Sequence, residues 1–351
     1  MNPAVARWVR GPVVPALAAA VLFGVTTPLA KQLALPPFEL AGLLYLGSGV
    51  GLFSYRLLRD RGWTTTGLAR SDVKWLSASI IFGGILAPAC LMIGLLRISA
   101  TTASLLLNFE SLFTALIAWA IFKEHAGARI IIGMLFVFAG GVVLSGPFGA
   151  RGFTSTGAVW IAFACLGWAL DNNFTRPISG GDSLFIAATK GLVAGTINLG
   201  IAIAISEPVG ARGKLVASLF LGLAGYGVSL VLFVLSLRGL GASRTGAYFA
   251  SAPFIGGVFA LIVLREPFSA SILMGGALML IGVILHLTED HRHEHEHKSM
   301  THTHSHVHDE HHQHQHDVPV AGTNSHTHEH THAPLRHHHA HFPDIHHQHT
   351  H

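Results

Sequence analysis

Hydrophobic residues along this chain form long runs that are separated by short polar segments. Between residues 13 and 287 these runs are each about 20 residues long, the length that an α-helix needs to cross the apolar core of a bilayer. A soluble α/β protein of this size would interrupt such runs with charged residues far more often. The pattern predicts an all-α integral membrane protein with ten transmembrane helices, at approximately 13–32, 38–57, 74–96, 101–122, 129–146, 156–175, 184–205, 215–236, 243–264 and 269–287.

The first run follows Arg7 and Arg10, as the hydrophobic part of a signal peptide would. It continues to Ala30 without a well-placed cleavage site, so we expect it to be retained as the first span. Cys90 and Cys165 both fall inside predicted spans. There we expect buried small residues and no disulfide.

Lys and Arg residues flank the predicted spans unevenly on the two sides of the membrane. With the N-terminus inside, twelve of them lie on the inner side and six on the outer side, the latter being Lys31, Arg97, Arg151, Arg212, Lys214 and Arg265. Because loops rich in Lys and Arg stay in the cytoplasm, we expect both termini to be cytoplasmic, in the inner membrane of a bacterium.

The hydrophobic part of the chain contains an internal repeat. ISATTASLLLNFESLFTALIAWAIFKE (98–124) aligns without gaps on LGASRTGAYFASAPFIGGVFALIVLRE (240–266), and Phe23-Gly24 with Lys31 aligns on Trp168-Ala169 with Arg176. The alignments predict two halves of five spans each. An odd number of spans means that the second half is inverted in the membrane, as in many secondary transporters whose substrate site lies near the midplane.

Four of these features together resemble the EamA-type proteins of the drug/metabolite transporter superfamily. They are the ten spans, the five-plus-five repeat, an aromatic and a small residue in the first span of each half, and a Glu at the end of the fourth span of each half (Glu124 and Glu266). The resemblance implies a first repeat at 13–147 and a second at 155–288. It also implies that small metabolites are carried, often outward, through a central cavity by alternating access. The sequence departs from the pattern at Phe23, where the family often has Trp, and at Glu110-Ser111, where the second half has Ala252-Pro253.

Glu110 is the clearest ionisable residue inside a predicted span. Such residues are costly in hydrocarbon and usually serve a transport pathway or a partner. Glu110 projects away from Asn108, with Thr114 near its side, and we take all three as candidates to line the cavity. Glu110 is either a proton-coupling carboxylate or cation ligand, or a structural carboxylate paired to a neighbouring helix.

Other candidate cavity residues lie in the second half. Asp171 and Asn172 either bind a polar substrate or end the sixth span and hold Arg176. Lys190 either extends to the inner surface or pairs with Glu110 or Asp171. Tyr226 and Tyr248 each share a helix face with a serine three residues later, which fits either a polar cavity wall or a helix–helix contact.

Residues 291–351 have a composition of their own, with 24 of the 26 histidines of the chain and almost no aliphatic residues. They cannot bury enough apolar surface to offset chain entropy, so we expect a disordered tail. Imidazole is the commonest protein ligand for metals, and four ligands per ion would allow on the order of six ions. Zn, Ni or Co are the expected ions; pH sensing and inert low complexity are the other interpretations. The candidate ligands recur mainly as His-X-His: His293, His295, His297, His302, His304, His306, His308, His326, His328, His330, His332, His346, His347, His349 and His351.

Three functions remain open. The first is a secondary transporter, expected to export a small organic solute, with the tail as a metal-responsive accessory. The second is efflux of divalent metal fed by the tail, and the third is a membrane-anchored metal buffer or sensor.

The sequence lacks a phosphate-binding glycine loop with Lys and a nucleophile placed beside a His, so we expect neither ATP drive nor an enzyme. We expect the hydrophobic part of the chain to require no cofactor. The expected partners are the lipid bilayer and the substrate, with a homodimer as an open alternative; nothing indicates nucleic acid.

Overall fold

The computed structural model describes residues 13–62, 66, 68–121, 128–145, 154–178, 181–288, 292–297, 300–306, 326–332 and 335–340. For residues 118, 154, 155, 176, 237–244 and those beyond 288, the description covers the backbone alone. The chain divides into two compact units, the first containing Met1–Glu289 and the second Asp290–His349.

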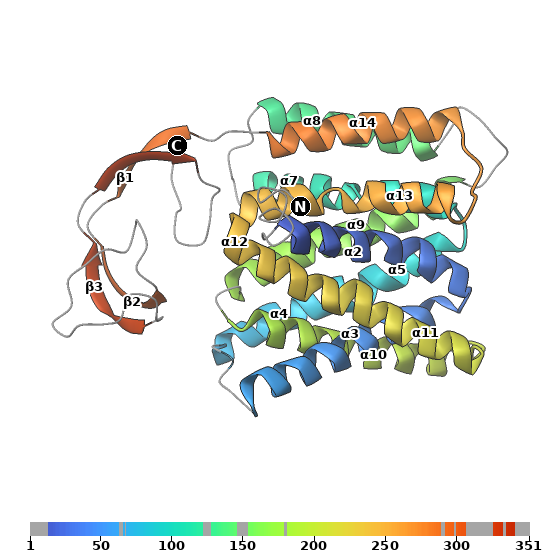
Figure 1. Ribbon diagram of the computed structural model, residues 1–351, viewed down its shortest axis with the longest axis horizontal. Coiled ribbons are helices and arrows are strands. Elements are labelled where there is room, and N and C mark those ends of the chain that lie inside the picture. Colours follow the sequence, from blue (N-terminus) through green and yellow to red (C-terminus); the bar gives the residue numbers. More distant parts are fainter. Residues whose placement is uncertain are drawn as a thin grey trace, which may run out of the picture. The chain divides into compact units, whose positions relative to one another are not determined.

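The described part of the first unit is entirely helical (Figure 1). Its first half contains α2 (Val13–Leu33), α3 (Pro37–Asp60), the 3-10 turn Arg70–Asp72, α4 (Val73–Ser79), the π-helix Ile80–Leu86, α5 (Ala87–Leu95), α6 (Ala100–Leu106), α7 (Phe109–Ala120) and α8 (Ala128–Ser145). Its second half contains α9 (Thr154–Thr175), the 3-10 turn Arg176–Ile178, α10 (Ser183–Ala204), α11 (Arg212–Gly222), the π-helix Leu223–Val228, α12 (Ser229–Phe249), α13 (Ala252–Ile262) and α14 (Ala270–Leu287). We call the end of the bundle with Val13 and Leu287 the near end and the opposite end the far end.

Eight helical stretches in the described residues are long and apolar enough to cross a membrane. The other two predicted spans are occupied by α3 and α9, which carry more polar residues, including Glu39 and Arg56 in α3 and Asp171 in α9. The all-helical prediction is therefore confirmed for the described residues of this unit. By length and composition alone, eight of the ten predicted spans are suited to cross a membrane in the described residues.

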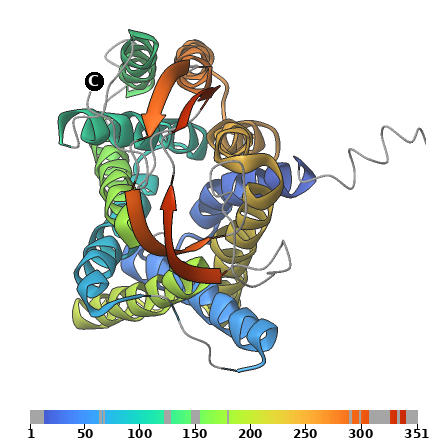
Figure 2. The same ribbon diagram turned by 90° about the vertical axis from the view of Figure 1, so that its left-hand side faces the viewer.

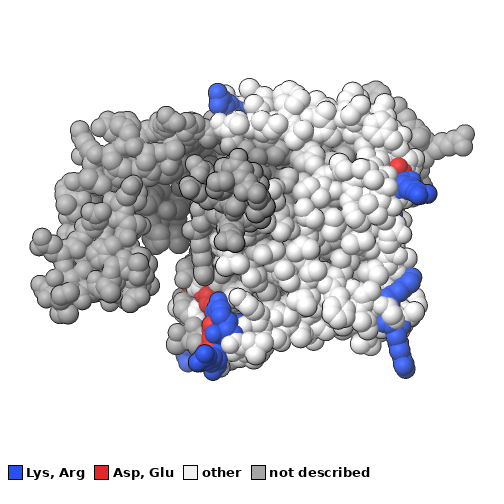
Figure 3. All heavy atoms as spheres, viewed as in Figure 1, with Lys and Arg blue, Asp and Glu red and all other residues white. Residues whose placement is uncertain are grey.

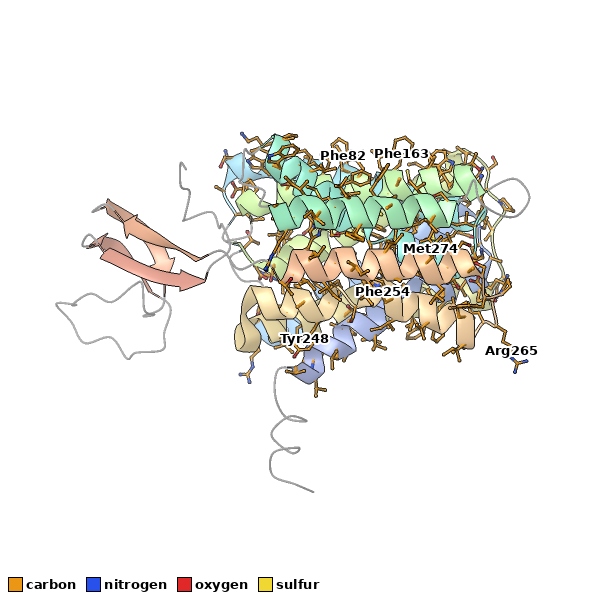
Figure 4. The ribbon with its side chains drawn as sticks, turned by 90° about the horizontal axis from the view of Figure 1, so that it is seen from above. Phe82, Phe163, Tyr248, Phe254, Arg265 and Met274 are labelled. Carbon is orange, nitrogen blue, oxygen red and sulfur yellow. The ribbon has the colours of Figure 1, made fainter. Side chains whose placement is uncertain are left out.

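The surface of the helical bundle is suited to lipid. Lys, Arg, Asp and Glu gather at its two ends, and the face between them is uncharged in the view of Figure 3. Large apolar side chains are exposed on this belt, such as Leu135 (61 %), Phe220 (67 %) and Leu273 (63 %). Figure 4 shows Phe163 on the outside of the bundle and Arg265 at its far end. A soluble protein rarely exposes so much contiguous apolar surface.

Four predicted spans are interrupted, and the interruptions repeat between the halves. The third and eighth spans each contain a π-helix, and the offset that aligns 98–124 on 240–266 brings Ile81–Leu86 onto Leu223–Val228. The fourth span breaks between α6 and α7, and the ninth breaks between α12 and α13. The ninth span was expected to start at 243 after a loop, but α12 continues as helix to Phe249.

Pairs of equivalent helices pack closely at glycines. A Cβ at Gly191 of α10 would come within 2.6 Å of the Gly49 Cα of α3. A Cβ at Gly140 of α8 would come within 2.7 Å of the Gly275 carbonyl oxygen of α14. Small residues allow helix backbones to approach in this way. We call these two contacts, α3 with α10 and α8 with α14, the glycine seams.

The far end is held together by carboxylates that bind helix N-termini. Glu266 accepts hydrogen bonds from the amides of Ala100 and Thr101, both 2.7 Å, at the start of α6. Glu207 accepts from the amide of Glu39 at 2.9 Å, at the start of α3. These acceptors satisfy amides that have no partner within the helix and complement its positive end. They also tie the second half to the first.

The near end has a different tie between the halves. Arg56 of α3 donates a hydrogen bond to Asp182 at 2.8 Å, and Asp182 also accepts from the amides that begin α10. The guanidinium lies over the Phe185 ring, 5.4 Å from its centroid. The charge of Arg56, whose side chain is fully buried, is thereby compensated where α3 meets α10.

The second unit contains four strands, β1 (Arg292–His297), β2 (Met300–His306), β3 (His326–His332) and β4 (Leu335–Ala340). β1 pairs with β4 and β2 with β3, both antiparallel (Figure 2). The described segments are thus paired strands, where the sequence analysis expects disorder. The difference has a physical reason, because alternating His-Thr and His-Glu sequences have the period of two that suits a strand. A two-stranded sheet is nevertheless only marginally stable by itself in water.

The α3–α10 seam gives a test of the packing. Gly191→Ala places a methyl group against the Gly49 backbone, and overpacking of this kind costs about 1–3 kcal/mol of unfolding free energy. Gly200→Ala lies on the same helix in open space and should be neutral or stabilising, since Ala favours helix over Gly by about 1 kcal/mol. Thermal unfolding in detergent micelles measures both. Equal stability of the two variants would contradict the close approach.

Candidate functional site

A buried ion pair lies between α9 and α10. Lys190 Nζ is 2.7 Å from each of the two carboxylate oxygens of Asp171. The hydroxyls of Ser79 and Thr175 also donate to Asp171 Oδ1. Asp171 therefore has a full set of partners, and its charge is balanced by Lys190. Of the two alternatives for Lys190, the structure has the pairing with Asp171.

Glu110 is a second carboxylate, placed at the start of α7 just after the break in the fourth span. Its Oε1 accepts a hydrogen bond from Asn172 Nδ2 at 2.9 Å. It also interacts electrostatically with Asp171 and Lys190. Glu110 is half-buried and the adjacent Ser111 is exposed, although both lie in the middle of a predicted span. Glu110, Asn172, Asp171 and Lys190 are thus brought together, and we call these four residues the polar centre.

Four aromatic rings form a chain that begins beside the polar centre. Tyr45 interacts electrostatically with Glu110 and Asp171. Its ring centroid is 5.6 Å from that of Tyr226, Tyr226 is 5.7 Å from Phe23, and Phe23 is 5.1 Å from Phe249. All four side chains are half-buried. We call them the aromatic wall.

The π-helix in the third span fixes one end of this wall. The Gly83 carbonyl oxygen accepts hydrogen bonds from Tyr45 Oη at 2.8 Å and from Trp168 Nε1 at 3.0 Å. The Gly84 carbonyl oxygen accepts from Asn198 Nδ2 at 3.2 Å. A π-helix shifts the backbone hydrogen bonds by one residue and is frequent at functional sites. Here its carbonyls hold side chains from three other spans.

The remaining predicted residues lie elsewhere. Asn108 donates to the Leu105 carbonyl oxygen at 2.8 Å, so it serves the break between α6 and α7. Thr114 lies one turn after Glu110, and its buried hydroxyl has no hydrogen-bond partner among the described residues. Tyr248 is half-buried near the end of α12, and Ser251 donates to its carbonyl oxygen at 2.6 Å. Tyr226 belongs to the aromatic wall.

The predicted metal ligands of the tail are in two groups. His293, His295, His297, His302, His304, His306, His326, His328, His330 and His332 lie on described strands, without described side chains. His308, His346, His347, His349 and His351 lie outside the described residues. Within the residues that the structure describes, no group of three or more His, Cys, Asp or Glu is placed to hold a metal ion.

Tyr45, Ser79 and Trp168 lie at the site but are not among the residues predicted from the sequence. Continuing the repeat gives the signal that could have found Tyr45. The register that aligns Phe23 on Trp168 also aligns Thr26 on Asp171 and Tyr45 on Lys190. The packing follows this register, because a Cβ at Gly83 would collide with the Asp171 carboxylate and one at Gly225 with the Thr26 hydroxyl. The ion pair of one half thus occupies the place of an uncharged pair in the other.

Known proteins similar to this chain point to one function. The model of the EamA-like transporter family matches residues 12–146 and again residues 155–288. A protein of Methanothermobacter thermautotrophicus named as an uncharacterized transporter is 28 % identical over 287 residues, covering 77 % of this chain and 84 % of that protein. An uncharacterized transporter of Archaeoglobus fulgidus is 26 % identical over 273 residues, covering 74 % and 90 %. One crystal structure superposes with a TM-score of 0.58 at 20 % identity, over 78 % of this chain and 95 % of that one, which shows a shared fold.

The helical bundle with an uncharged belt and a polar centre between its two repeats defines an integral membrane transporter, not an enzyme. The chain belongs to the EamA-like transporter family, whose model matches both of its halves. Its surroundings are the lipid bilayer, and its substrate is a small molecule.

The ion pair of the polar centre can be tested by its effect on stability. Lys190→Met leaves the buried Asp171 charge without a cation, which should cost about 3–5 kcal/mol of unfolding free energy. The double variant Asp171→Asn with Lys190→Met removes both charges and should recover most of the loss. Thermal unfolding in detergent measures the effects, with the exposed Lys74→Met as control. A double variant no more stable than Lys190→Met would show that the pair is not coupled.

Proposed function

We propose that this protein is a secondary transporter that exports a small organic solute by alternating access. The observation that carries the proposal is the unequal burial along the fourth span. Ser104 on α6 is buried (1 % exposed), whereas Glu110 is half-buried and Ser111 exposed on α7. A path open from one end to the midplane and closed at the other is what alternating access requires.

The helix packing supports a far end that is closed. α6 packs on α13, which belongs to the other half of the repeat, and on α2 of its own half. α7, in the described residues, packs mainly on α8 and α9. The breaks between α6 and α7 and between α12 and α13 separate the packed half of each span from the other half. We infer that movement at these breaks closes one end of the bundle and opens the other.

The distribution of charge supports an orientation of the protein in the membrane. Lys and Arg residues favour a cytoplasmic near end, with both termini in the cytoplasm of a bacterial inner membrane. The polar centre would then be open to the cytoplasm in this conformation. Export is favoured, because substrate would enter from the side on which the cell makes it.

We also propose that the tail binds divalent transition metals and regulates the transporter. The strand register supports a concentration of ligands, since it pairs His302 with His330, His304 with His328 and His306 with His326. Residues two apart on a strand and directly opposite on its partner share one face. Such a face of imidazoles suits Zn, Ni or Co.

Metal efflux fed by this tail is the alternative, and the polar centre favours it less. Asp171 is already neutralised by Lys190, and Glu110 is accompanied by an amide. Zn sites usually have three or four His, Cys or carboxylate ligands.

Alternating access predicts a one-sided pattern of chemical labelling. In a protein with Cys90 and Cys165 replaced by Ala, Ser111→Cys should react with a membrane-impermeant maleimide added at the near end. Ser104→Cys, on the same span, should react at least about tenfold more slowly, as expected for a fully buried thiol. Mass spectrometry of the labelled protein measures both rates. Equal labelling of the two positions would contradict a closed far half.

The tail predicts metal binding that can be separated from transport. The full chain should bind on the order of six Zn²⁺ ions by calorimetry, and a chain ending at Asp290 should bind none of these. In proteoliposomes neither form should carry Zn²⁺, Ni²⁺ or Co²⁺. Metal flux in both forms that is lost in Glu110→Gln would instead establish the metal-efflux alternative.

A further inference from the structure

The charges of the polar centre do not cancel. Asp171 and Lys190 neutralise each other at 2.7 Å, with the hydroxyls of Ser79 and Thr175 completing the set. Glu110 accepts a hydrogen bond from the Asn172 amide at 2.9 Å. Two carboxylates and one ammonium leave a single negative charge, and that charge belongs to Glu110. A lone carboxylate at membrane depth is stabilised when a cation joins it.

Glu110 is also the accessible member of the pair of carboxylates. Its side chain is half-buried, and its neighbours Ser111 and Asn172 are exposed. Asp171, by contrast, is buried, with 9 % of its side chain exposed. An incoming ligand therefore reaches the uncompensated charge before it reaches the compensated one. Since Lys190 contacts both Asp171 oxygens, an anionic ligand would have to break this pair to gain a partner.

The aromatic wall begins at Tyr45, which interacts electrostatically with Glu110 and is held in place. Tyr45 is fixed by its hydrogen bond to the Gly83 carbonyl oxygen and by the Trp168 indole at 3.3 Å. Tyr226, Phe23 and Phe249 extend the wall from there. Aromatic faces attract cations and bury apolar or planar groups. A chain of four rings that begins at Tyr45, which interacts with the carboxylate, is complementary to a ligand with one positive charge and an apolar body.

We propose that the substrate of this transporter is a monovalent organic cation, an amine whose nitrogen binds between Glu110 and Asn172 and whose apolar body lies on Tyr45, Tyr226, Phe23 and Phe249. The proposal rests on the transport function proposed above and names its substrate class. The ammonium donates to the Glu110 carboxylate, a charge-assisted hydrogen bond. Asn172 already donates to that carboxylate, which leaves its amide oxygen available as a second acceptor.

The positions equivalent to the charged residues of the polar centre are uncharged in the other half of the repeat. In the first half, Thr26 and Tyr45 stand where the second half has Asp171 and Lys190. In the ninth span, Ala252 stands where the fourth span has Glu110. The charged residues of the polar centre are thus found in α7, α9 and α10, and the rings come from α2, α3, the second π-helix and α12. An amine with an apolar body can span these two chemically different sides.

The proposal can be tested with three small probes on the purified full-length protein. Phenethylamine carries both features, butylamine carries the charge without the ring, and phenylacetate carries the ring with a negative charge. Binding to protein in lipid nanodiscs is measured by calorimetry. We expect phenethylamine to bind most tightly, butylamine more weakly and phenylacetate not at all. Binding of phenylacetate or Zn²⁺ as tight as that of phenethylamine would overturn the proposal, as would no binding of phenethylamine.

Substitutions test separately the carboxylate of Glu110 and the aromatic wall. Glu110→Gln should weaken phenethylamine by about tenfold or more, the loss expected for a charge-assisted contact, while Glu110→Asp should retain most of the affinity. Tyr226→Leu should weaken phenethylamine and leave butylamine unchanged. Asp72→Asn, at the exposed start of the third span, is the control. Unchanged phenethylamine affinity in Glu110→Gln would contradict the role of Glu110.

The accessibility of Ser111→Cys and Ser104→Cys separates this proposal from the transport function. That pattern depends on which end of the bundle is closed and on no ligand. If the pattern is one-sided and phenethylamine fails to bind, only the substrate class is wrong. If both positions are labelled equally, the transport function itself is contradicted.

Discussion

Inside a bilayer every backbone amide and carbonyl needs a partner from the protein, and this requirement governs the structure. Regular α-helix meets it without help. In the described residues, the long helices depart from regular geometry at two π-helices and at two breaks. At the first π-helix, side chains take up the freed carbonyl groups. Tyr45 and Trp168 donate to the Gly83 carbonyl oxygen, and Asn198 donates to that of Gly84. The irregular backbone and the residues around the polar centre are therefore parts of the same arrangement.

Much of the fold was predictable from the sequence because lipid imposes a long and uniform pattern on each span. The positions of α2, α8, α10 and α14 follow directly from hydrophobic runs. The continuation of α12 to Phe249 was not predicted, since residues 237–242 lie between two of the predicted spans. The π-helices were missed as well, since a one-residue shift in hydrogen bonding leaves no trace in hydrophobicity. The described strands of the tail follow the alternation of His with Thr and Glu, which composition alone does not register.

The site was predictable to the extent that charge inside a span marks it. Glu110, Asp171 and Lys190 were predicted in this way and Asn172 as the neighbour of Asp171, and the structure brings the four together. Their pairing could not be derived from the sequence, because either Glu110 or Asp171 could have been the partner of Lys190. Tyr45 and Phe23 carry no charge and look like ordinary span residues. Only contacts between helices distant in sequence show that they form a wall with Tyr226 and Phe249.

The glycine seams have a consequence for how the two halves could diverge. In the α8–α14 seam, Gly140 meets Gly275 and Gly133 meets Gly282, and the repeat alignment exchanges these two pairs. The seam is therefore self-complementary, like the isologous interface of a two-fold dimer. In a true dimer every substitution would appear twice, on both sides of the axis. Joining the halves in one chain removes that constraint, and the symmetric seam can then hold an asymmetric interior, with Asp171 and Lys190 on one side of the axis and Thr26 and Tyr45 on the other.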